Sequence, residues 1–397
     1  MPTTVILGAG IIGLSTAYYL SSQSPSETIH LVESSPALFA SASGKAAGFL
    51  ARDWFPAASS ALGALSFDLH KKLAEEHNGK EKWGWGPSVS YSLDSTKGTE
   101  KGEDWLLAGA SRASVVAETR DGDVRPKWLT NTGALRKLSD SDTTGIVDPL
   151  RLCEWLLEQC KSRCVRLHHP AKATKVLTTD SSLSGIQVTY SDTGTTSEIP
   201  CDALVISAGA WTTLVYRTLF PAAPRAPHIS SLAGHSLVFK SPHWTGADEA
   251  EGGGVCHAVF TTHPGGFSPE IFSRVGGHIW LGGLNDAHLD VPELATDVKT
   301  DEKSTETLRE VGRWLCGDEL EVIREGLCHR PVTRTGVPLV ARVPEGDLGG
   351  VKGRGRVYVA SGHGPWGISL SLGTGLVVSE MVLGMKTSAD ISALARF

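Results

Sequence analysis

Near the amino terminus, residues 3–20 read TTVILGAGIIGLSTAYYL, and three glycines follow the first apolar run. The β-branched residues before Gly8 predict a strand, and the apolar residues after Gly10 recur at helical spacing. A Gly-x-Gly-x-x-Gly pattern between a strand and a helix is typical of a dinucleotide site. Gly8 permits the tight turn, Gly10 lets the backbone approach a pyrophosphate, and Gly13 lets the helix lie close to the strand.

A second predicted strand, Thr28–Val32, ends at Glu33, which follows Gly13 by 20 residues. A carboxylate at this place accepts hydrogen bonds from the hydroxyls of an adenosine ribose and repels the 2′-phosphate of NADP. The alternative is a glycine-rich turn with an unrelated surface glutamate. Because strand, helix and acid occur together at the required spacing, we predict an adenine dinucleotide along this βαβ unit.

The loop after Glu33 favours FAD over NAD. Its sequence, SSPALFASASGKAAGFLARDW over residues 34–54, consists mostly of small side chains. The long isoalloxazine–ribityl arm of FAD must pass the backbone over many atoms, and the small residues from Ser43 to Gly48 leave that space. An NAD-linked dehydrogenase is a competing hypothesis, but it would leave this loop unexplained.

The bulk composition is that of an ordinary globular protein. The chain has 397 residues, of which 41% are hydrophobic and 20% charged, and its net charge is −6. This length predicts two domains. We expect no nucleic-acid partner, because no run of Lys or Arg is long enough to follow a phosphate backbone. We also expect no integral membrane segment, because no apolar run has the required length.

The cysteines and histidines predict neither disulfides nor a metal site. The seven cysteines are odd in number and lack zinc-type spacing, which is typical of reduced thiols and favours a cytoplasmic location. The final residues, ALARF, loosely resemble a peroxisomal signal, so the peroxisome is the alternative. His168-His169 and the histidines from His257 to His263 lack companion ligands, and we predict no metal.

Three further stretches follow the glycine motif: the run Ser43–Gly48, DALVISAGAW over residues 202–211, and VYVASGHGPWGISLSLGTG over residues 357–375. In this order they resemble the D-amino-acid oxidase, glycine oxidase and sarcosine oxidase (DAO) family of FAD-dependent amine-oxidising flavoproteins. The subgroup that the chain resembles is a little-characterised soluble fungal branch. The resemblance implies an α/β fold, with a Rossmann-like FAD-binding domain and an antiparallel or mixed β-sheet substrate domain.

The cofactor motifs lie at both ends and in the middle of the chain, so the predicted FAD-binding domain is discontinuous. It comprises residues 1–56, 146–225 and 345–397. Residues 57–145 and 226–344 would form the substrate domain, since HSLVFK, AVFTTH and HIWLGGL are typical of strands. We expect a mixed sheet, with helices on one face, that lies above the flavin.

The motifs and the resemblance together imply a set of residues that contact FAD. They are Gly8, Gly10, Ile11, Ile12, Gly13, Glu33, Ser34, Ser43, Gly44, Lys45, Ala46, Ala47, Gly48, Phe49, Ala173, Ala208, Gly209, Trp211, Arg330, Gly362, His363, Gly364, Pro365, Trp366, Gly367 and Ile368. Peptide N–H groups at the turn after Gly362 would face the electron-rich edge of the flavin. Ala173 stands where relatives bind adenine through backbone groups.

The resemblance also implies the chemistry. A small-molecule amine or amino acid would lie over the flavin, pass its α-hydride to N5, and leave O2 or another acceptor to reoxidise the ring. Residues 326–340, GLCHRPVTRTGVPLV, resemble a family segment whose arginine anchors a substrate carboxylate in some relatives. Arg330 matches that arginine, and a planar guanidinium suits the task. A structural ion pair is the alternative role.

Three further catalytic contacts are expected from Lys45, His363 and Trp366. Each has a structural alternative: Lys45 as a solvated loop residue, His363 as a cap of its turn, and Trp366 as a packing residue. We expect FAD to bind non-covalently. The alternative is a thioether through Cys328, which matches the position of flavin attachment in sarcosine oxidases.

The chain departs from the family pattern at two positions. Pro365 stands where glycine oxidase has a substrate-binding arginine, and Trp280 stands where sarcosine oxidase has an oxygen-activating lysine. These departures motivate a second hypothesis. In it the chain is an FAD-binding protein with a regulatory or trafficking role, and its amine oxidation is weak or lost.

Overall fold

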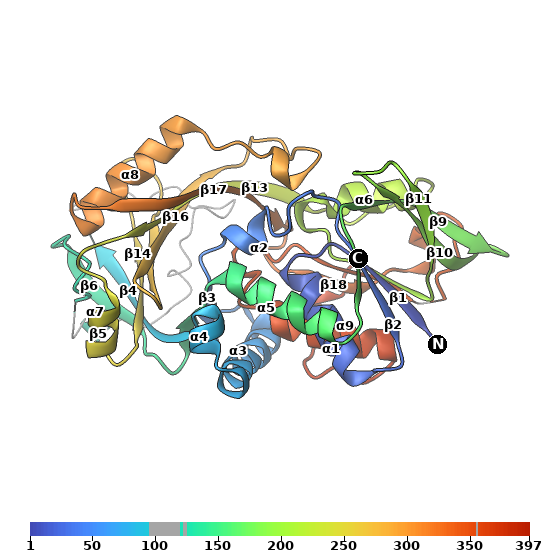
Figure 1. Cartoon of the computed structure of the whole chain (residues 1–397), viewed down its shortest axis with the longest axis horizontal. Coiled ribbons are helices and arrows are strands. Elements are labelled where there is room, and N and C mark those ends of the chain that lie inside the picture. Colours follow the sequence, from blue (N-terminus) through green and yellow to red (C-terminus); the bar gives the residue numbers. More distant parts are fainter. Residues whose placement is uncertain (95–119, 122–124, 355) are drawn as a thin grey trace.

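The first apolar run forms β1 (Thr3–Leu7), a fully buried strand in a six-stranded sheet. The computed structural model describes residues 1–94, 120–121, 125–354 and 356–397, and this sheet lies in one of its two lobes (Figure 1). The other strands are β2 (Thr28–Val32), β8 (Arg166–His168), β12 (Ala203–Ile206), β18 (Leu339–Arg342) and β19 (Val357–Ser361). Their order is β18-β19-β12-β1-β2-β8, and every pairing except β18–β19 is parallel.

Both faces of this sheet are covered, which explains why its strands are apolar without alternation. One face is covered by α1 (Ile11–Gln23), α5 (Pro149–Ser162) and α9 (Ser371–Leu383). The other is covered by α6 (Thr212–Leu219) and by a three-stranded sheet of β9 (Ala171–Thr179), β10 (Ser182–Tyr190) and β11 (Thr196–Pro200). Along β1, Ile6 packs in the first of these cores and Val5 and Leu7 pack in the second.

The second lobe is built on a ten-stranded sheet, here called the cap sheet. Its strands are β3 (Phe49–Ala51), β4 (Gly86–Asp94), β5 (Arg120–Asp121), β6 (Ala134–Ser139), β7 (Thr144–Ile146), β13 (Ser230–Lys240), β14 (Cys256–Thr261), β15 (Glu270–Arg274), β16 (His278–Asp286) and β17 (Glu321–Val332). The main path is β17-β13-β16-β15-β14-β4-β6-β5, with β3 and β7 beside it. The β14–β4 pairing is parallel and the neighbouring pairings are antiparallel. The predicted α/β fold, with a Rossmann-like sheet and a mixed second sheet, is confirmed.

The two faces of the cap sheet have different neighbours. Helix α8 (Glu302–Cys316) packs on one face through Leu308, Val311 and Leu315. On the opposite face, Phe272 and Trp280 stack at 5.6 Å between ring centroids and belong to the core that also contains α1 and α9. The cap sheet therefore turns one face toward the first lobe.

The remaining helices are α2 (Ala42–Lys45), α3 (Ala57–His77), α4 (Gly79–Trp83) and α7 (Gly246–Glu251). Two strands depart from the division made on the sequence, which put residues 1–56 in the FAD-binding domain and residues 226–344 in the substrate domain. Strand β3 lies in the cap sheet, where it pairs with β7. Strand β18 lies instead at the edge of the six-stranded sheet, because residues 339–342 pair with β19. No helix among the described residues is long and apolar enough to cross a bilayer.

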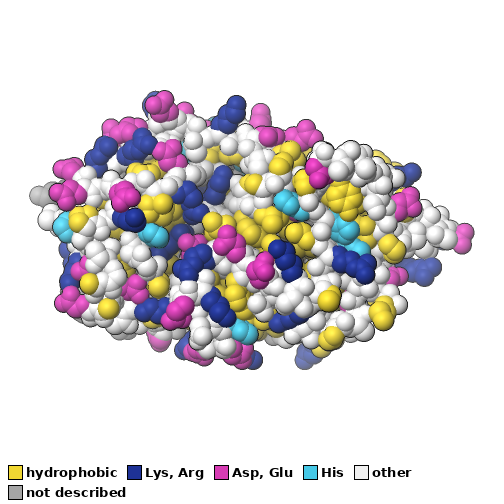
Figure 2. Space-filling model, viewed as in Figure 1, with side chains coloured by type: hydrophobic (Ala, Val, Ile, Leu, Met, Phe, Trp, Pro, Cys, Tyr) yellow, Lys and Arg dark blue, Asp and Glu magenta, His cyan; other side chains and the backbone are white. Residues whose placement is uncertain are grey.

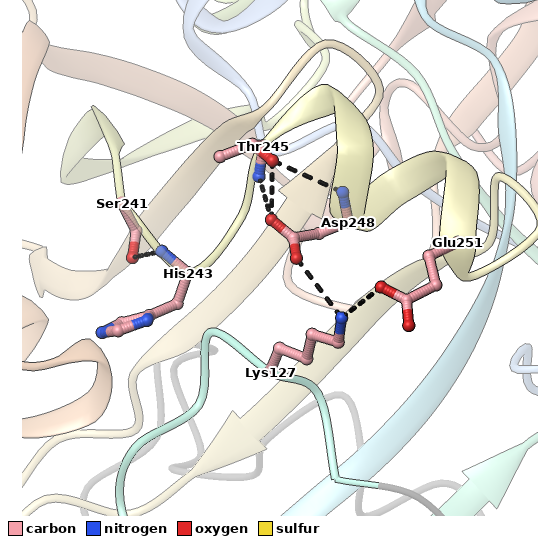
Figure 3. Close-up of polar contacts among 6 residues, drawn as sticks. All are labelled: Lys127, Ser241, His243, Thr245, Asp248 and Glu251. Carbon is pink, nitrogen blue, oxygen red and sulfur yellow. Dashed lines mark hydrogen bonds and ion pairs between the residues drawn. The ribbon is translucent and has the colours of Figure 1, made fainter.

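The surface carries mixed charge. Figure 2 shows acidic and basic side chains interspersed over one face, with apolar side chains gathered near its centre. A typical surface cluster joins α7 to the segment before β6: Lys127 Nζ lies between the carboxylates of Asp248 and Glu251 (Figure 3). Thr245 caps α7 by accepting the Asp248 N–H. Because Lys127 is exposed, these pairs contribute little to stability and serve to hold the segment on the cap lobe.

Candidate flavin site

A large cavity lies where the carboxyl ends of β1, β2 and β12 meet beneath the cap sheet. Ligands of open parallel sheets bind at this edge. The cavity encloses about 1920 Å³, including the space at its mouth. Its lining runs from Gly8 after β1 to Arg330 on β17, so an extended ligand in it would contact both lobes.

The glycine turn at one end of the cavity has no room for side chains. Gly8 has φ +102°, and a Cβ there would lie 2.6 Å from the carbonyl oxygen of Ser207, which directly follows β12. A Cβ on Gly13 would lie 2.0 Å from the Gly8 carbonyl oxygen, so α1 lies directly on the turn. The Ile11 N–H donates to Ser43 Oγ at 2.9 Å, which ties the second loop to the start of α1. The cradle therefore requires glycine on steric grounds.

Glu33 lies at the end of β2 and lines the cavity. Its Oε2 accepts the Ala9 N–H at 3.0 Å, and its Oε1 accepts the Ser35 N–H at 2.9 Å. Both oxygens are thus held by backbone donors, and each has a further lone pair for another donor. A carboxylate fixed in this way fits the two hydroxyls of an adenosine ribose.

The second loop brings Lys45 against the cap sheet. Its aliphatic stem runs beside Gly326, and its Nζ donates to the Leu327 carbonyl oxygen at 3.0 Å. Burial lowers the pKa of the Lys45 ammonium, although the neighbouring Cys328 opposes this shift. The Trp280 indole N–H donates to the Lys45 carbonyl oxygen at 3.2 Å. Lys45 is therefore a partly buried cation in the wall of the cavity rather than a solvated residue.

Arg330 lies further along the same wall. Its guanidinium lies over Gly234 of β13, where an added Cβ would be 2.3 Å from Nη1. It also donates to Asn285 Oδ1 on β16. Arg330, Asn285 and the buried carboxylate of Glu270 all line the cavity. This wall therefore presents groups of both charges.

The turn after β19 closes the far end of the cavity. His363 is buried there, and its Nε2 is 3.1 Å from Thr374 Oγ1 of α9. Burial lowers the pKa of His363 to about 3, so the imidazole is neutral at physiological pH. The Trp366 ring packs against Phe55 and Phe49, at 4.8 and 6.3 Å between ring centroids. It belongs to an aromatic core and does not line the cavity.

Most of the residues that the sequence indicated come together at this cavity. Those that line it are Gly8, Gly10, Ile11, Ile12, Glu33, Ser34, Ser43, Lys45, Ala46, Ala47, Ala173, Ala208, Gly209, Trp211, Arg330, His363, Gly364, Pro365, Gly367 and Ile368. Six lie behind the lining: Gly13, Gly44, Gly48, Phe49, Gly362 and Trp366. Gly13 and Gly44 lie in helices where an added Cβ would meet a backbone carbonyl, and Gly48 and Gly362 have positive φ. Phe49 and Trp366 are packing residues. Cys328 and Trp280 also line the cavity.

Several lining residues were missed by the sequence reading. They are Lys172, Leu214, Gly234, Ser236, Glu270, Asn285, Glu293 and Leu294. The alternation of Gly234 and Ser236 on one strand was a usable signal, since small residues spaced by two share a face. No sequence motif around Glu270 or Glu293 indicates that these residues line the cavity. Their place depends on how the cap sheet sits on the first lobe.

The glycine turn, Glu33 and a cavity between a parallel sheet and a cap are together typical of proteins that bind an extended dinucleotide. A family model described as FAD dependent oxidoreductase, DAO, matches residues 3–381. The chain belongs to this DAO family, and it is an FAD-dependent oxidoreductase.

The relatives span the whole chain. The Schizosaccharomyces pombe protein named "Putative oxidoreductase C1F5.03c" is 27% identical, over 98% of this chain and 96% of its own length. The Saccharomyces cerevisiae protein named "Putative oxidoreductase TDA3" is 25% identical, over 98% of this chain and 93% of its own length. Glycine oxidase from Geobacillus kaustophilus has the same fold, with a TM-score of 0.75 and 19% identity over 100% of this chain and 98% of its own.

Proposed function

We propose that the chain oxidises the C–N bond of an amine or amino acid, with hydride transfer to N5 of FAD and O2 as the final acceptor. One observation carries the proposal. The cavity that begins at the glycine turn and Glu33 continues without a break to Arg330 and Lys45 on the cap sheet. A cofactor cradle and a charged wall for a small polar substrate thus share one space.

Bound FAD would supply the electron-accepting ring, and the chain supplies orientation and electrostatics. Glu33 would bind the ribose, and the start of α1 would face the pyrophosphate. The small residues Ala46 and Ala47 would lie along the ring. Of the two modes of attachment we propose the non-covalent one, because Cys328 is buried and a thioether requires a reactive thiolate.

Arg330 would bind the carboxylate of an amino-acid substrate. Its guanidinium is held in place by Gly234 beneath it and by Asn285 beside it, so a bidentate contact costs little side-chain entropy. Lys45 would place positive charge at the reacting side, where Trp280 replaces the lysine of sarcosine oxidases. A cation there stabilises negative charge that develops during reduction and during reaction with O2.

His363 and Trp366 have supporting roles in this proposal. A neutral His363 bonded to Thr374 keeps the turn in place and exchanges no proton near pH 7. Trp366 supports the turn from the aromatic core. The predicted catalytic set thereby reduces to Arg330 and Lys45.

The test begins with the absorption spectrum of the purified protein before and after acid precipitation, which reports FAD and its covalency together. Anaerobic addition of a panel of amines and amino acids should bleach the flavin band, and air should restore it with release of peroxide. Arg330→Met should raise KM for amino acids at least tenfold. Arg342→Met, on β18 and outside the cavity, is the control. A yellow protein that no amine bleaches would contradict the proposal.

The second candidate, an FAD-binding protein with a regulatory or trafficking role, is favoured by one feature. The Trp280 indole lies over Gly282 and occupies the cap wall, and Pro365 lines the opposite end. This candidate predicts tightly bound FAD, no bleaching by any amine, and wild-type FAD affinity in Arg330→Met.

A further inference from the structure

Arg274, at the end of β15, reaches across from the cap sheet to the second loop of the flavin site. Its side chain is buried, with 3% exposed. Nη2 donates to the carbonyl oxygens of Ala46 and Ala47, each at 2.8 Å, and Nη1 lies 3.5 Å from Asp148 Oδ2. One guanidinium group thus holds two consecutive carbonyls of the loop.

These two contacts determine where the loop's N–H groups point. The peptide bonds at Ala46–Ala47 and Ala47–Gly48 are trans, so each N–H points opposite to the carbonyl of the same peptide unit. The N–H groups of Ala47 and Gly48 therefore point away from Arg274. Ala46 and Ala47 line the cavity and Arg274 does not. Among the described residues, neither N–H donates to a protein acceptor.

The arrangement is costly, which argues that it does more than fill space. Arg274 Nε has no acceptor among the described residues, and burial lowers the pKa of the guanidinium to about 10. The carboxylate of Asp148 partly compensates the charge while its Oδ1 caps α5 by accepting the Leu150 N–H. A buried cation with an unsatisfied donor reduces stability, so its presence here favours a role beyond packing.

We propose that Arg274 is a positioning residue that aims the Ala47 N–H group into the cavity at the bound flavin and thereby sets the reduction potential of the flavin. The inference rests on the flavin lying in this cavity, as in the proposed function. A backbone donor that faces the ring stabilises the electron-rich reduced form more than the oxidised form. Arg274 touches neither ring nor substrate and acts only through the loop.

The test uses the FAD-loaded protein and three variants, Arg274→Met, Arg274→Lys and Asp148→Asn. The readouts are the midpoint potential against a reference dye and the visible spectrum of the oxidised flavin. Arg274→Met should shift the reduction equilibrium at least tenfold toward the oxidised form, which is about 30 mV for a two-electron couple. Arg274→Lys should have a midpoint potential between that of Arg274→Met and that of the wild type. Asp148→Asn keeps the cap of α5 and should give a smaller shift in the same direction.

Arg225→Met is the matched control. Arg225 bonds Asp347 through Nε and Nη2 at 2.9 and 2.6 Å, away from the cavity, so its loss should lower thermal stability and leave the potential unchanged. If the Arg274 variants are yellow and have the wild-type potential and spectrum, the inference about Arg274 is wrong, while the proposed flavin site is unaffected. Wild-type protein that binds no FAD would overturn the flavin site as well. If Arg274→Met does not fold, the midpoint potentials of Arg274→Lys and Asp148→Asn test the inference in its place.

Discussion

At the scale of single residues, three glycines of the cap sheet each lie beneath a larger side chain of the cavity wall. Gly234 lies beneath Arg330, Gly282 beneath the Trp280 indole, and Gly326 beside the Lys45 stem. An added Cβ would be 2.3 Å from Arg330 at the first position and 2.3 Å from Trp280 at the second. The absence of a side chain at these positions lets the wall residues lie flat.

Gly234→Ala should displace the Arg330 guanidinium and weaken carboxylate binding. We expect KM for an amino-acid substrate to rise about tenfold, or roughly 1.4 kcal/mol, with a smaller change in kcat. The measurement is steady-state kinetics with an amino acid and with the matching amine that lacks the carboxylate. Gly246→Ala is the control, because nothing lies within 4 Å of its added Cβ. An equal loss for both substrates would contradict the anchoring role of Arg330.

Glu33→Gln should weaken FAD binding. The amide NH2 cannot accept a hydrogen bond, so either the Ala9 or the Ser35 N–H loses its acceptor and the ribose loses a charged one. Such a loss costs about 1–3 kcal/mol, or roughly a 5- to 150-fold increase in the Kd for FAD. Quenching of FAD fluorescence on titration measures this Kd. Glu198→Gln, on the outer strand β11, should leave it unchanged.

At the scale of elements, residues 287–301, here called the strap, connect β16 to α8 and cross the mouth of the cavity. The Trp211 indole N–H donates to the Pro292 carbonyl oxygen at 2.7 Å, and Lys172 pairs with Glu293 at 3.1 Å. Leu294 and Ala295 line the cavity opposite α6. The strap therefore joins the cap lobe to the residues around the predicted adenine position.

Trp211→Phe should speed the release of FAD by removing the bond to the strap. A lost hydrogen bond costs about 1 kcal/mol, so the dissociation rate should rise roughly five-fold. The recovery of FAD fluorescence after a large dilution into buffer gives the rate. Trp314→Phe on α8 is the control, since Trp314 does not line the cavity. An unchanged rate would mean that the strap does not retain the cofactor.

At the scale of the whole molecule, buried neutral histidines make the fold sensitive to acid. Burial lowers the pKa of His30, His70 and His257 to about 4, and that of His363 to about 3. Unfolding returns each pKa toward 6.5, so the unfolded chain binds more protons between pH 6.5 and 4. Their stabilisation is complete above pH 6.5 and is lost as the pH falls through this window.

The free energy of unfolding should therefore fall steeply below pH 6.5. Each fully buried histidine, such as His70 or His363, contributes up to about 1.4 kcal/mol per pH unit. Urea unfolding followed by tryptophan fluorescence at several pH values measures the slope. His70→Gln retains a donor for the Ile368 carbonyl. It should reduce the slope of the free energy of unfolding against pH by up to the contribution of one proton, which is about 1.4 kcal/mol per pH unit. A stability that is flat between pH 7 and 5 would refute this expectation.

The cofactor end of the molecule could be predicted from the sequence because its signals are local. Gly8, Gly13 and Glu33 lie within one βαβ unit, where the spacing of strand, turn and helix determines geometry. The cap wall could not be predicted in the same way. Which residues of β13 and β16 face the cavity depends on strand register, and the pairing of these strands shifts between His235 and Ser236.

The sequence by itself determined the class of fold, the place of the dinucleotide turn and the family, because these follow from short-range periodicity and motif order. Only the tertiary structure showed that Arg274 donates to the carbonyls of Ala46 and Ala47. It also showed that Arg330 lies over Gly234 and that Trp366 packs in the aromatic core. Those contacts join residues that lie far apart in the sequence, with 228 positions between Arg274 and Ala46. Their geometry comes from the packing of two sheets, which no local pattern of residues encodes.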